Sequence, residues 1–265
     1  TGNNRLHVTH SHRWEMNYVW NSPETQRMVS SNVSYQLSRN DVAMGYTYDR
    51  HTGIYTYRPE NVNGNNVLNG KVNCSTPLDK LKRLKLELNT DVTYRHSMDL
   101  SSDSPDQVPQ TSAVRTTYLT QGLRINYSIS SIHLGGKASG TYTRQTSPRA
   151  GFVTTDAASY QYGINCTADI PMGWQISTDA TMYSRRGYAD KAFNTDHFVW
   201  NIRVAKKFMK GRLTVMLDGF DILNNISNVR QTLNAQGRTE TWYMSIPRYA
   251  MLHAVYRFSK SPQRK

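Results

Sequence analysis

Ionisable side chains recur at alternate positions within otherwise apolar segments. In residues 84–95, Lys85, Glu87, Asp91 and Arg95 fall on one face of an extended chain, and leucine, valine and tyrosine fall on the other. Such a set has two chemical uses, because opposite charges on adjacent strands can pair and a row of them can line a water-filled channel. The residues that we expect to line a lumen are Lys85, Glu87, Asp91, Arg95, Arg124, Asp169, Asp179, Arg203, Asp218 and Arg257.

Other residue types that could do chemistry are present without the spacing that chemistry needs. Serine and histidine are plentiful, but no nucleophile elbow or similar local signature is found. His7, His10 and His12 lie in an irregular polar end, which favours a structural reading over a metal site. Cys74 and Cys166 form no CxxC motif and fall about four strands apart, too far for a disulfide. We therefore expect no enzyme activity, no metal site and no cofactor.

The chain is strongly basic, with 32 Lys and Arg residues against 19 Asp and Glu residues and a formal net charge of +13. A charge of this size is common in nucleic-acid-binding proteins, but no recognition motif accompanies it. The densest basic run, residues 80–85, falls in a predicted short turn and the start of a strand. We therefore expect no nucleic-acid partner, and instead contacts with anionic lipid head groups and acidic solutes.

The segments that position these side chains alternate with a period of two, as a β-strand does and a helix does not. Twelve residues span about 40 Å as a strand, enough to cross a hydrocarbon core of about 25–30 Å at a tilt of about 40°. Counting back from the C-terminus predicts about twelve strands, at residues 11–19, 27–37, 42–57, 65–76, 84–97, 113–129, 133–145, 159–170, 174–185, 197–208, 212–224 and 249–258.

The connections alternate between short and long. Residues 130–131, 171–173 and 209–211 form tight turns. The long polar connections, where we expect any ligand contacts, are residues 98–112, 146–158, 185–196 and 225–248. This layout predicts an all-β fold, with residues 1–265 as one antiparallel transmembrane β-barrel region that lacks a plug domain and ends in a basic tail at 259–265.

A soluble β-sandwich also has alternating strands and is the main alternative fold. Strands of soluble proteins average about five or six residues, whereas several of the strands predicted here exceed ten. Aromatic residues also cluster near the predicted strand ends, as in the interfacial girdles of membrane barrels. The aromatic residues of this set are Trp174, Tyr183, Phe198, Phe208, Tyr249 and Phe258.

Three stretches resemble the C-terminal part of TonB-dependent receptor barrels, of the outer-membrane β-barrel family common in Bacteroidetes-type bacteria. They are residues 58–64 (RPENVNG) with 76–80 (TPLDK), residues 218–225 (DGFDILNN), and residues 247–249 (PRY) before the last strand. We expect Pro59 and Gly64 to bracket a tight reversal. The last strand resembles the signal read by the barrel-assembly machinery, and its membrane-boundary residues are Leu252, Ala254, Tyr256 and Phe258.

The resemblance implies TonB-driven uptake of a nutrient ligand through a barrel in the bacterial outer membrane. Because a full receptor has about 22 strands, about twelve strands predict a C-terminal fragment, with the TonB system and a plug domain as partners only within a longer chain. The alternatives are a self-contained barrel of about twelve strands, acting as a pore or a hydrolase, and a soluble basic β-rich binding protein. Lipopolysaccharide, other outer-membrane lipid and the barrel-assembly machinery are the remaining expected partners.

Overall fold

The structure is a computed structural model of the chain and describes residues 3–49, 51–102, 110–188, 191–226, 229–234, 237–242, 246 and 248–258. The predicted basic tail at 259–265 lies outside the described residues, as do parts of the predicted long connections 98–112, 185–196 and 225–248. Three single-turn 3-10 helices, η1 (Pro171–Gly173), η2 (Lys191–Phe193) and η3 (Met209–Gly211), accompany the strands. No helix among the described residues is long and apolar enough to cross a membrane.

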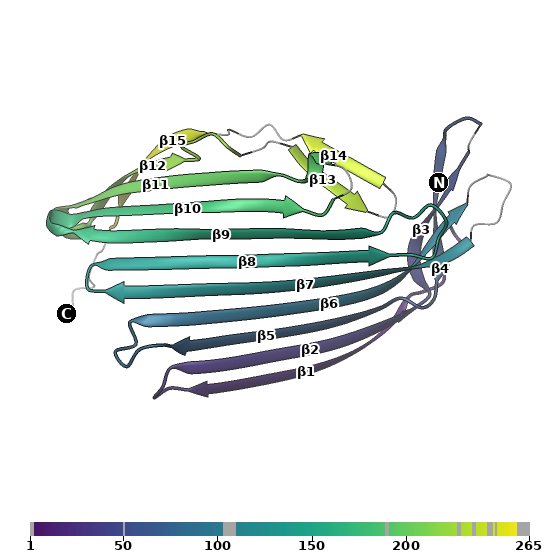
Figure 1. The fold of residues 1–265 in the computed structure, drawn as a ribbon, viewed down its shortest axis with the longest axis horizontal. Coiled ribbons are helices and arrows are strands. Elements are labelled where there is room, and N and C mark those ends of the chain that lie inside the picture. The colour runs from purple at the N-terminus through teal and green to yellow at the C-terminus, as the bar shows by residue number, and fades with distance from the viewer. Residues whose placement is uncertain are drawn as a thin grey trace, which may run out of the picture.

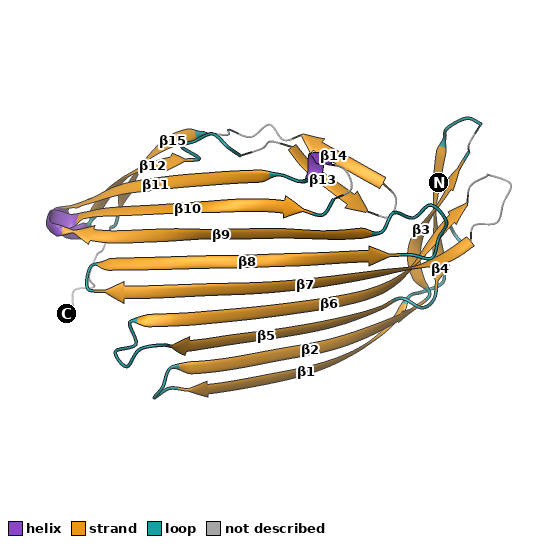
Figure 2. Ribbon diagram, in the orientation of Figure 1, coloured by secondary structure: helices purple, strands orange, loops and turns teal. Residues whose placement is uncertain are grey.

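The rest of the secondary structure is extended (Figure 2). The strands are β1 (His10–Ser22), β2 (Arg27–Arg39), β3 (Asp41–Tyr48), β4 (Tyr55–Val62), β5 (Asn66–Pro77), β6 (Leu84–Ser102), β7 (Gln110–Ile129), β8 (Ile132–Thr146), β9 (Thr155–Ile170), β10 (Trp174–Arg186), β11 (Asp196–Phe208), β12 (Leu213–Phe220), β13 (Val229–Asn234), β14 (Gly237–Trp242) and β15 (Tyr249–Tyr256).

Most of these strands form one continuous antiparallel sheet in the order β1-β2-β5-β6-β7-β8-β9-β10-β11-β12-β15. Figure 1 shows the long strands lying side by side and the sheet curling at the β12 and β15 side. Short turns join the strands at one end, and the longer connections and the N-terminus lie at the other (Figure 1). The predicted all-β antiparallel fold is confirmed, and the sheet is open in this structure between β1 and β15.

One predicted barrel strand is wrong. Residues 42–57 form no single crossing but contribute to the hairpin of β3 and β4, which turns at residues 49–54. The hairpin branches off the sheet, where β3 makes only a two-residue parallel contact with β6. The chain folds back here because Asp49 accepts hydrogen bonds from the backbone of His51 and the side chain of Thr52, and Gly53 adopts a left-handed conformation (φ 72°). The continuous path therefore holds eleven strands.

Two smaller expectations also differ from the structure. Pro59 lies inside β4 and does not flank a turn, whereas Gly64, with φ of 105°, does take part in the reversal before β5. β4 pairs only with β3, so its proline lies on an edge strand, where the missing N–H matters least. The connection predicted at 225–248 contains a second hairpin, made of β13 and β14.

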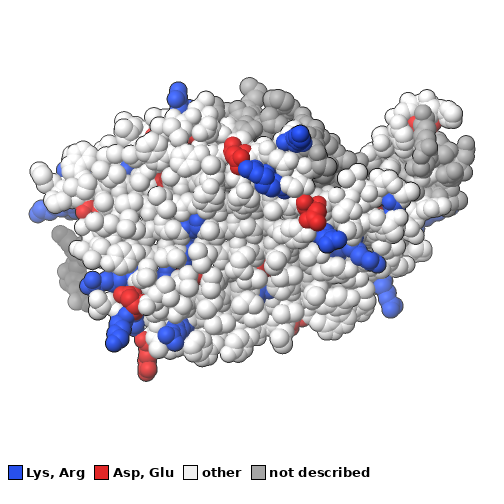
Figure 3. All heavy atoms as spheres, in the orientation of Figure 1, with Lys and Arg blue, Asp and Glu red and all other residues white. Residues whose placement is uncertain are grey.

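The strand register sorts the side chains onto two faces. Residues directly opposite each other share a face, so Leu88, which pairs with Cys74 and Leu123, marks an apolar face. Asn89, its neighbour in the chain, pairs with Asn73 and Gly122 on a polar face. Figure 3 shows one broad face on which charged side chains gather toward the strand ends and leave the middle largely uncharged.

The interior of this single-layer sheet is small. The buried hydrophobic residues among those described are Val62, Leu100, Val114, Ala157, Phe193, Val199 and Ala205. Many large apolar side chains remain exposed instead, including Trp14, Ile164 and Leu252. A sheet of this kind needs an apolar medium along one face, because exposed apolar area on this scale is unfavourable in water.

Four of the six predicted girdle aromatics lie on the apolar face, and two do not. Tyr183 pairs with Gln161 and His197, and Tyr249 pairs with Phe220, whose face is that of Asp218. Both tyrosines lie on the polar face, because each is an odd number of positions from an apolar-face residue of its own strand, Trp174 in β10 and Leu252 in β15. The two cysteines are free, as expected from their strand separation.

Candidate functional site: the polar face of the sheet

Nine of the ten predicted lumen-lining residues share the polar face by register, from Lys85 on β6 to Asp218 on β12. The tenth, Arg257, lies one residue beyond β15, where its backbone N–H donates to the carbonyl of Arg212. Sequence alternation therefore identified the face correctly, although lining a lumen remains a prediction about the role of these residues.

Charged groups on this face pair across strands and along them. Glu87 accepts from Lys85 at 3.1 Å and from Arg124 at 3.5 Å, so one carboxylate serves two cations. Asp91 pairs with Lys71 on β5 at 3.7 Å. These groups are one-third or more exposed, so each pair stabilises the fold by about 1 kcal/mol or less.

Asp218 is the most enclosed of the predicted residues, with a side chain 2% exposed. It receives a two-point contact from the Arg203 guanidinium, in which Nη2 lies 3.1 Å from Oδ2. The Nε2 atom of His253 on β15 lies 2.9 Å from the same oxygen. This cluster connects β11, β12 and β15 at the curled side of the sheet.

The remaining predicted residues have neutral partners or no partner. Asp169 accepts from the amide of Gln175 at 2.8 Å, and Asp179 accepts from the amide of Asn201 at 3.1 Å. Arg95 and Arg257 make no ion pair within the described part of the chain. The expected ion pairs between neighbouring strands are therefore present around β6 and around β12. On the strands between them, Asp169 and Asp179 accept hydrogen bonds from side-chain amides instead.

A groove of about 570 Å³ runs along the polar face from β2 to β9. Its lining includes four cations, of which Lys85 and Arg124 were predicted and Lys71 and Lys137 were not. The alternation does place Lys71 and Lys137 on polar positions, so the signal for them exists in the sequence. It is weaker than that of the mixed-charge segments, because each is a single lysine in a strand with few other charges.

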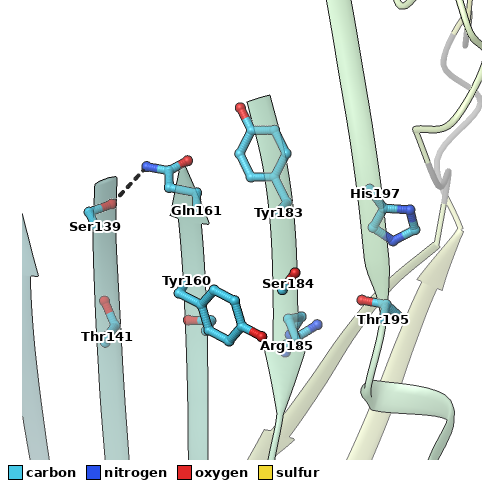
Figure 4. Close-up of a pocket in the computed structure, with 10 residues that line it drawn as sticks. Ser139, Thr141, Tyr160, Gln161, Tyr183, Ser184, Arg185, Thr195 and His197 are labelled. Carbon is cyan, nitrogen blue, oxygen red and sulfur yellow. Dashed lines mark hydrogen bonds between the residues drawn. The ribbon is translucent and has the colours of Figure 1, made fainter. Parts of the chain in front are cut away.

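A second, smaller groove of about 260 Å³ adjoins the first, because Ser139 and Gln161 line both. Figure 4 shows its side chains arriving from β8, β9, β10 and the start of β11, with the Gln161 amide donating to the Ser139 hydroxyl at 3.0 Å. Hydroxyl and amide groups dominate its lining, with Arg185 and His197 at one side. The polar face is therefore rich in hydrogen-bonding groups over several strands.

Within the described residues, no three His, Cys, Asp or Glu side chains converge as a metal site would require. His7, His10 and His12 contribute to no such group there. The ion pairs and amide hydrogen bonds described above are the contacts that this face makes among its own side chains.

A family model described as the outer membrane protein beta-barrel family matches residues 1–131 and again residues 119–256. The chain belongs to this family. Membership places the chain in the bacterial outer membrane, as expected, and removes the soluble alternative. No curated protein and no solved structure matches the chain.

Membership in the outer membrane protein beta-barrel family explains the two faces. In such barrels the apolar face meets lipid and the polar face meets water, with aromatic residues at the two boundaries. Lys206 lies near the short-turn end of the apolar face, with its ammonium 4.7 Å from the Trp174 ring and 5.9 Å from the Phe208 ring. A cation held over aromatic rings at this level fits a lipid boundary.

Proposed function

We propose that these residues form part of the barrel wall of a TonB-dependent receptor that takes up a nutrient ligand, and that they act without catalysis. The observation that carries the proposal is the parity of the sheet. Each of the eleven strands along the continuous path is antiparallel to its neighbours, so β1 and β15 run in the same direction. A seam between them would be parallel, whereas single-chain bacterial barrels are antiparallel with an even strand number.

An odd number of further strands is therefore needed to close an antiparallel barrel. A second copy of this chain cannot supply them, because all copies have one orientation in a membrane and their edges run the same way. Receptor barrels of 22 strands would need eleven more strands, and a self-contained barrel of twelve would need one. The order and spacing of the three receptor-like stretches favour the larger barrel.

The size of the native protein tests this proposal. We expect an antibody raised against these residues to detect, in purified outer membranes, a polypeptide far larger than 30.3 kDa. We also expect in-cell cross-linking to join that polypeptide to TonB. A heat-modifiable band near 30.3 kDa without a TonB cross-link would contradict the proposal and support a small barrel that stands alone.

Assembly and lipid contacts follow from the same proposal. The last strand presents Leu252, Ala254 and Tyr256 on the apolar face, and Phe258 lies two residues beyond its end. We propose that this strand is read by the barrel-assembly machinery and that lipopolysaccharide covers the apolar face. Depletion of the assembly machinery should remove the native polypeptide from outer membranes.

A further inference from the structure

We propose that the groove lined by Lys71, Lys85, Arg124 and Lys137 is a binding site for a small solute that carries phosphate or carboxylate groups. This inference rests on the proposed function in that it treats the polar face as the wall of an aqueous lumen. It adds the chemical class of the solute, which the family does not specify.

The first observation is the charge of the groove. Among the residues that line it, Glu87 is the single carboxylate and faces four cations. Glu87 is shared between Lys85 and Arg124, and Asp91 pairs with Lys71 from outside the lining, so two carboxylates in all are set against four cations. The lining therefore carries an excess of positive charge that attracts anions, and its concave form strengthens this effect.

The second observation is the position of Lys137. It lies directly opposite Arg124 in the pairing of β7 with β8, and like charges in such a pair are destabilising. Its other strand neighbour is Gly163, which has no side chain and so offers no carboxylate. No described residue forms an ion pair with Lys137, whereas Arg124 reaches Glu87. An anion lying between Arg124 and Lys137 would relieve the repulsion.

The third observation is the supply of neutral hydrogen-bonding groups. Asn73, Asn89 and Gln161 line the same groove and provide amide N–H donors. Ser75 and Ser139 add hydroxyl groups that can donate to phosphate or carboxylate oxygens. The volume of about 570 Å³ is within the range that accommodates small organic ligands. Charge, donors and volume together point to a small polyanion.

The test is equilibrium dialysis of radiolabelled inorganic pyrophosphate against the complete native polypeptide, purified from outer membranes in detergent. We expect saturable binding that Lys137→Gln weakens about tenfold or more, because it removes one charge-assisted contact. Lys137→Arg keeps the charge and should bind pyrophosphate within about threefold of the native protein.

The matched control is Lys210→Gln, in the exposed turn at η3, which should leave the affinity unchanged. Heat-modifiable gel mobility establishes that each variant is folded.

The absence of saturable binding in the intact protein would overturn the inference, and so would equal losses in Lys137→Gln and Lys210→Gln. If carboxylates of a plug domain occupied the groove, the intact protein would show no saturable binding of pyrophosphate. The immunoblot for native size is a separate measurement. A native band near 30.3 kDa would refute the receptor proposal while the dialysis still decided whether the groove binds anions.

Discussion

Individual side chains decide which face of the sheet meets lipid. Leu123 lies on the apolar face between Leu88 and Ala138, six residues before β7 ends at Ile129, and is 38% exposed. Leu123→Arg should lower the free energy of unfolding by about 2–4 kcal/mol, because a guanidinium near the membrane midplane loses its hydration. Urea titration of the protein in lipid vesicles, followed by tryptophan fluorescence, measures this loss.

The matched control places the same side chain on the other face. Thr120→Arg lies on the same strand opposite Asp91, where water and an opposite charge are both within reach. We expect this variant to unfold within about 0.5 kcal/mol of the native protein. If Thr120→Arg were the more damaging change, the assignment of the two faces would be wrong.

Gly163 is a residue whose absent side chain is structurally required. A Cβ atom built there would lie 2.4 Å from the carbonyl oxygen of Ala180 and 2.9 Å from the Cα atom of Thr181. Backbone atoms cannot turn aside as a side chain can, so β9 and β10 would have to separate. Gly163→Ala should therefore lower the free energy of unfolding by about 1–3 kcal/mol.

Gly136→Ala on the neighbouring strand is the control, because no atom lies within 4 Å of the position that the alanine methyl group would occupy there. It should change the free energy of unfolding by no more than about 0.5 kcal/mol. Both measurements use the same urea titration. Equal effects of the two alanines would show that strand propensity, and not the close approach of β10, governs these positions.

The turn between β5 and β6 depends on the side chain of Asp79. Its carboxylate accepts a hydrogen bond from the backbone N–H of Leu84 at 2.7 Å. This bond, with weaker ones from Arg83 and Leu81, holds the pKa of Asp79 below its ordinary value of 3.8. Between the folded and unfolded pKa values, the unfolded chain binds more protons. Ionised Asp79 therefore stabilises the turn above pH 3.8, and this contribution is lost as the pH falls through the lower folded value.

Asp79→Asn should consequently be less stable than the native protein at neutral pH, and the difference should narrow as the pH falls below about 4. Thermal unfolding in detergent at a series of pH values checks both parts. A difference that stays constant down to strongly acidic pH would mean that the charge of Asp79 has no role in the turn.

Sequence and structure agree on the long strands and differ at residues 42–57. Period-two alternation located the long strands, since Leu84 and its alternate neighbours need lipid on one side and Lys85 and its neighbours need water on the other. It misjudged residues 42–57, because a hairpin with Tyr46 opposite Tyr57 and Tyr48 opposite Tyr55 also alternates. Nothing in the alternation distinguishes a strand that crosses the sheet from two that fold back on each other outside it. Nor does alternation give the register between strands, such as the pairing that puts Lys137 opposite Arg124.

The whole molecule differs from the sequence-based expectation through that one hairpin. Removing residues 42–57 from the barrel wall changes an even set of strands to eleven, and the parity determines how the sheet can close. It also places the two chain ends of the continuous sheet on opposite sides of the membrane. β1 begins at the long-connection end, and β15 finishes at the short-turn end (Figure 1).

This orientation is open to a direct test, because long connections are extracellular and short turns periplasmic in outer-membrane barrels. Thr52 lies at the exposed tip of the β3/β4 hairpin, and Lys210 lies in the exposed turn at η3. In a background of Cys74→Ser and Cys166→Ser, Thr52→Cys should react with a membrane-impermeant maleimide on intact cells. Lys210→Cys should react only after the outer membrane is opened. Labelling of Lys210→Cys on intact cells would show that the short turns are extracellular and that β1 begins at the periplasmic side. The strand that closes the barrel against β1 would then run from the extracellular side to the periplasm, opposite to the direction inferred here.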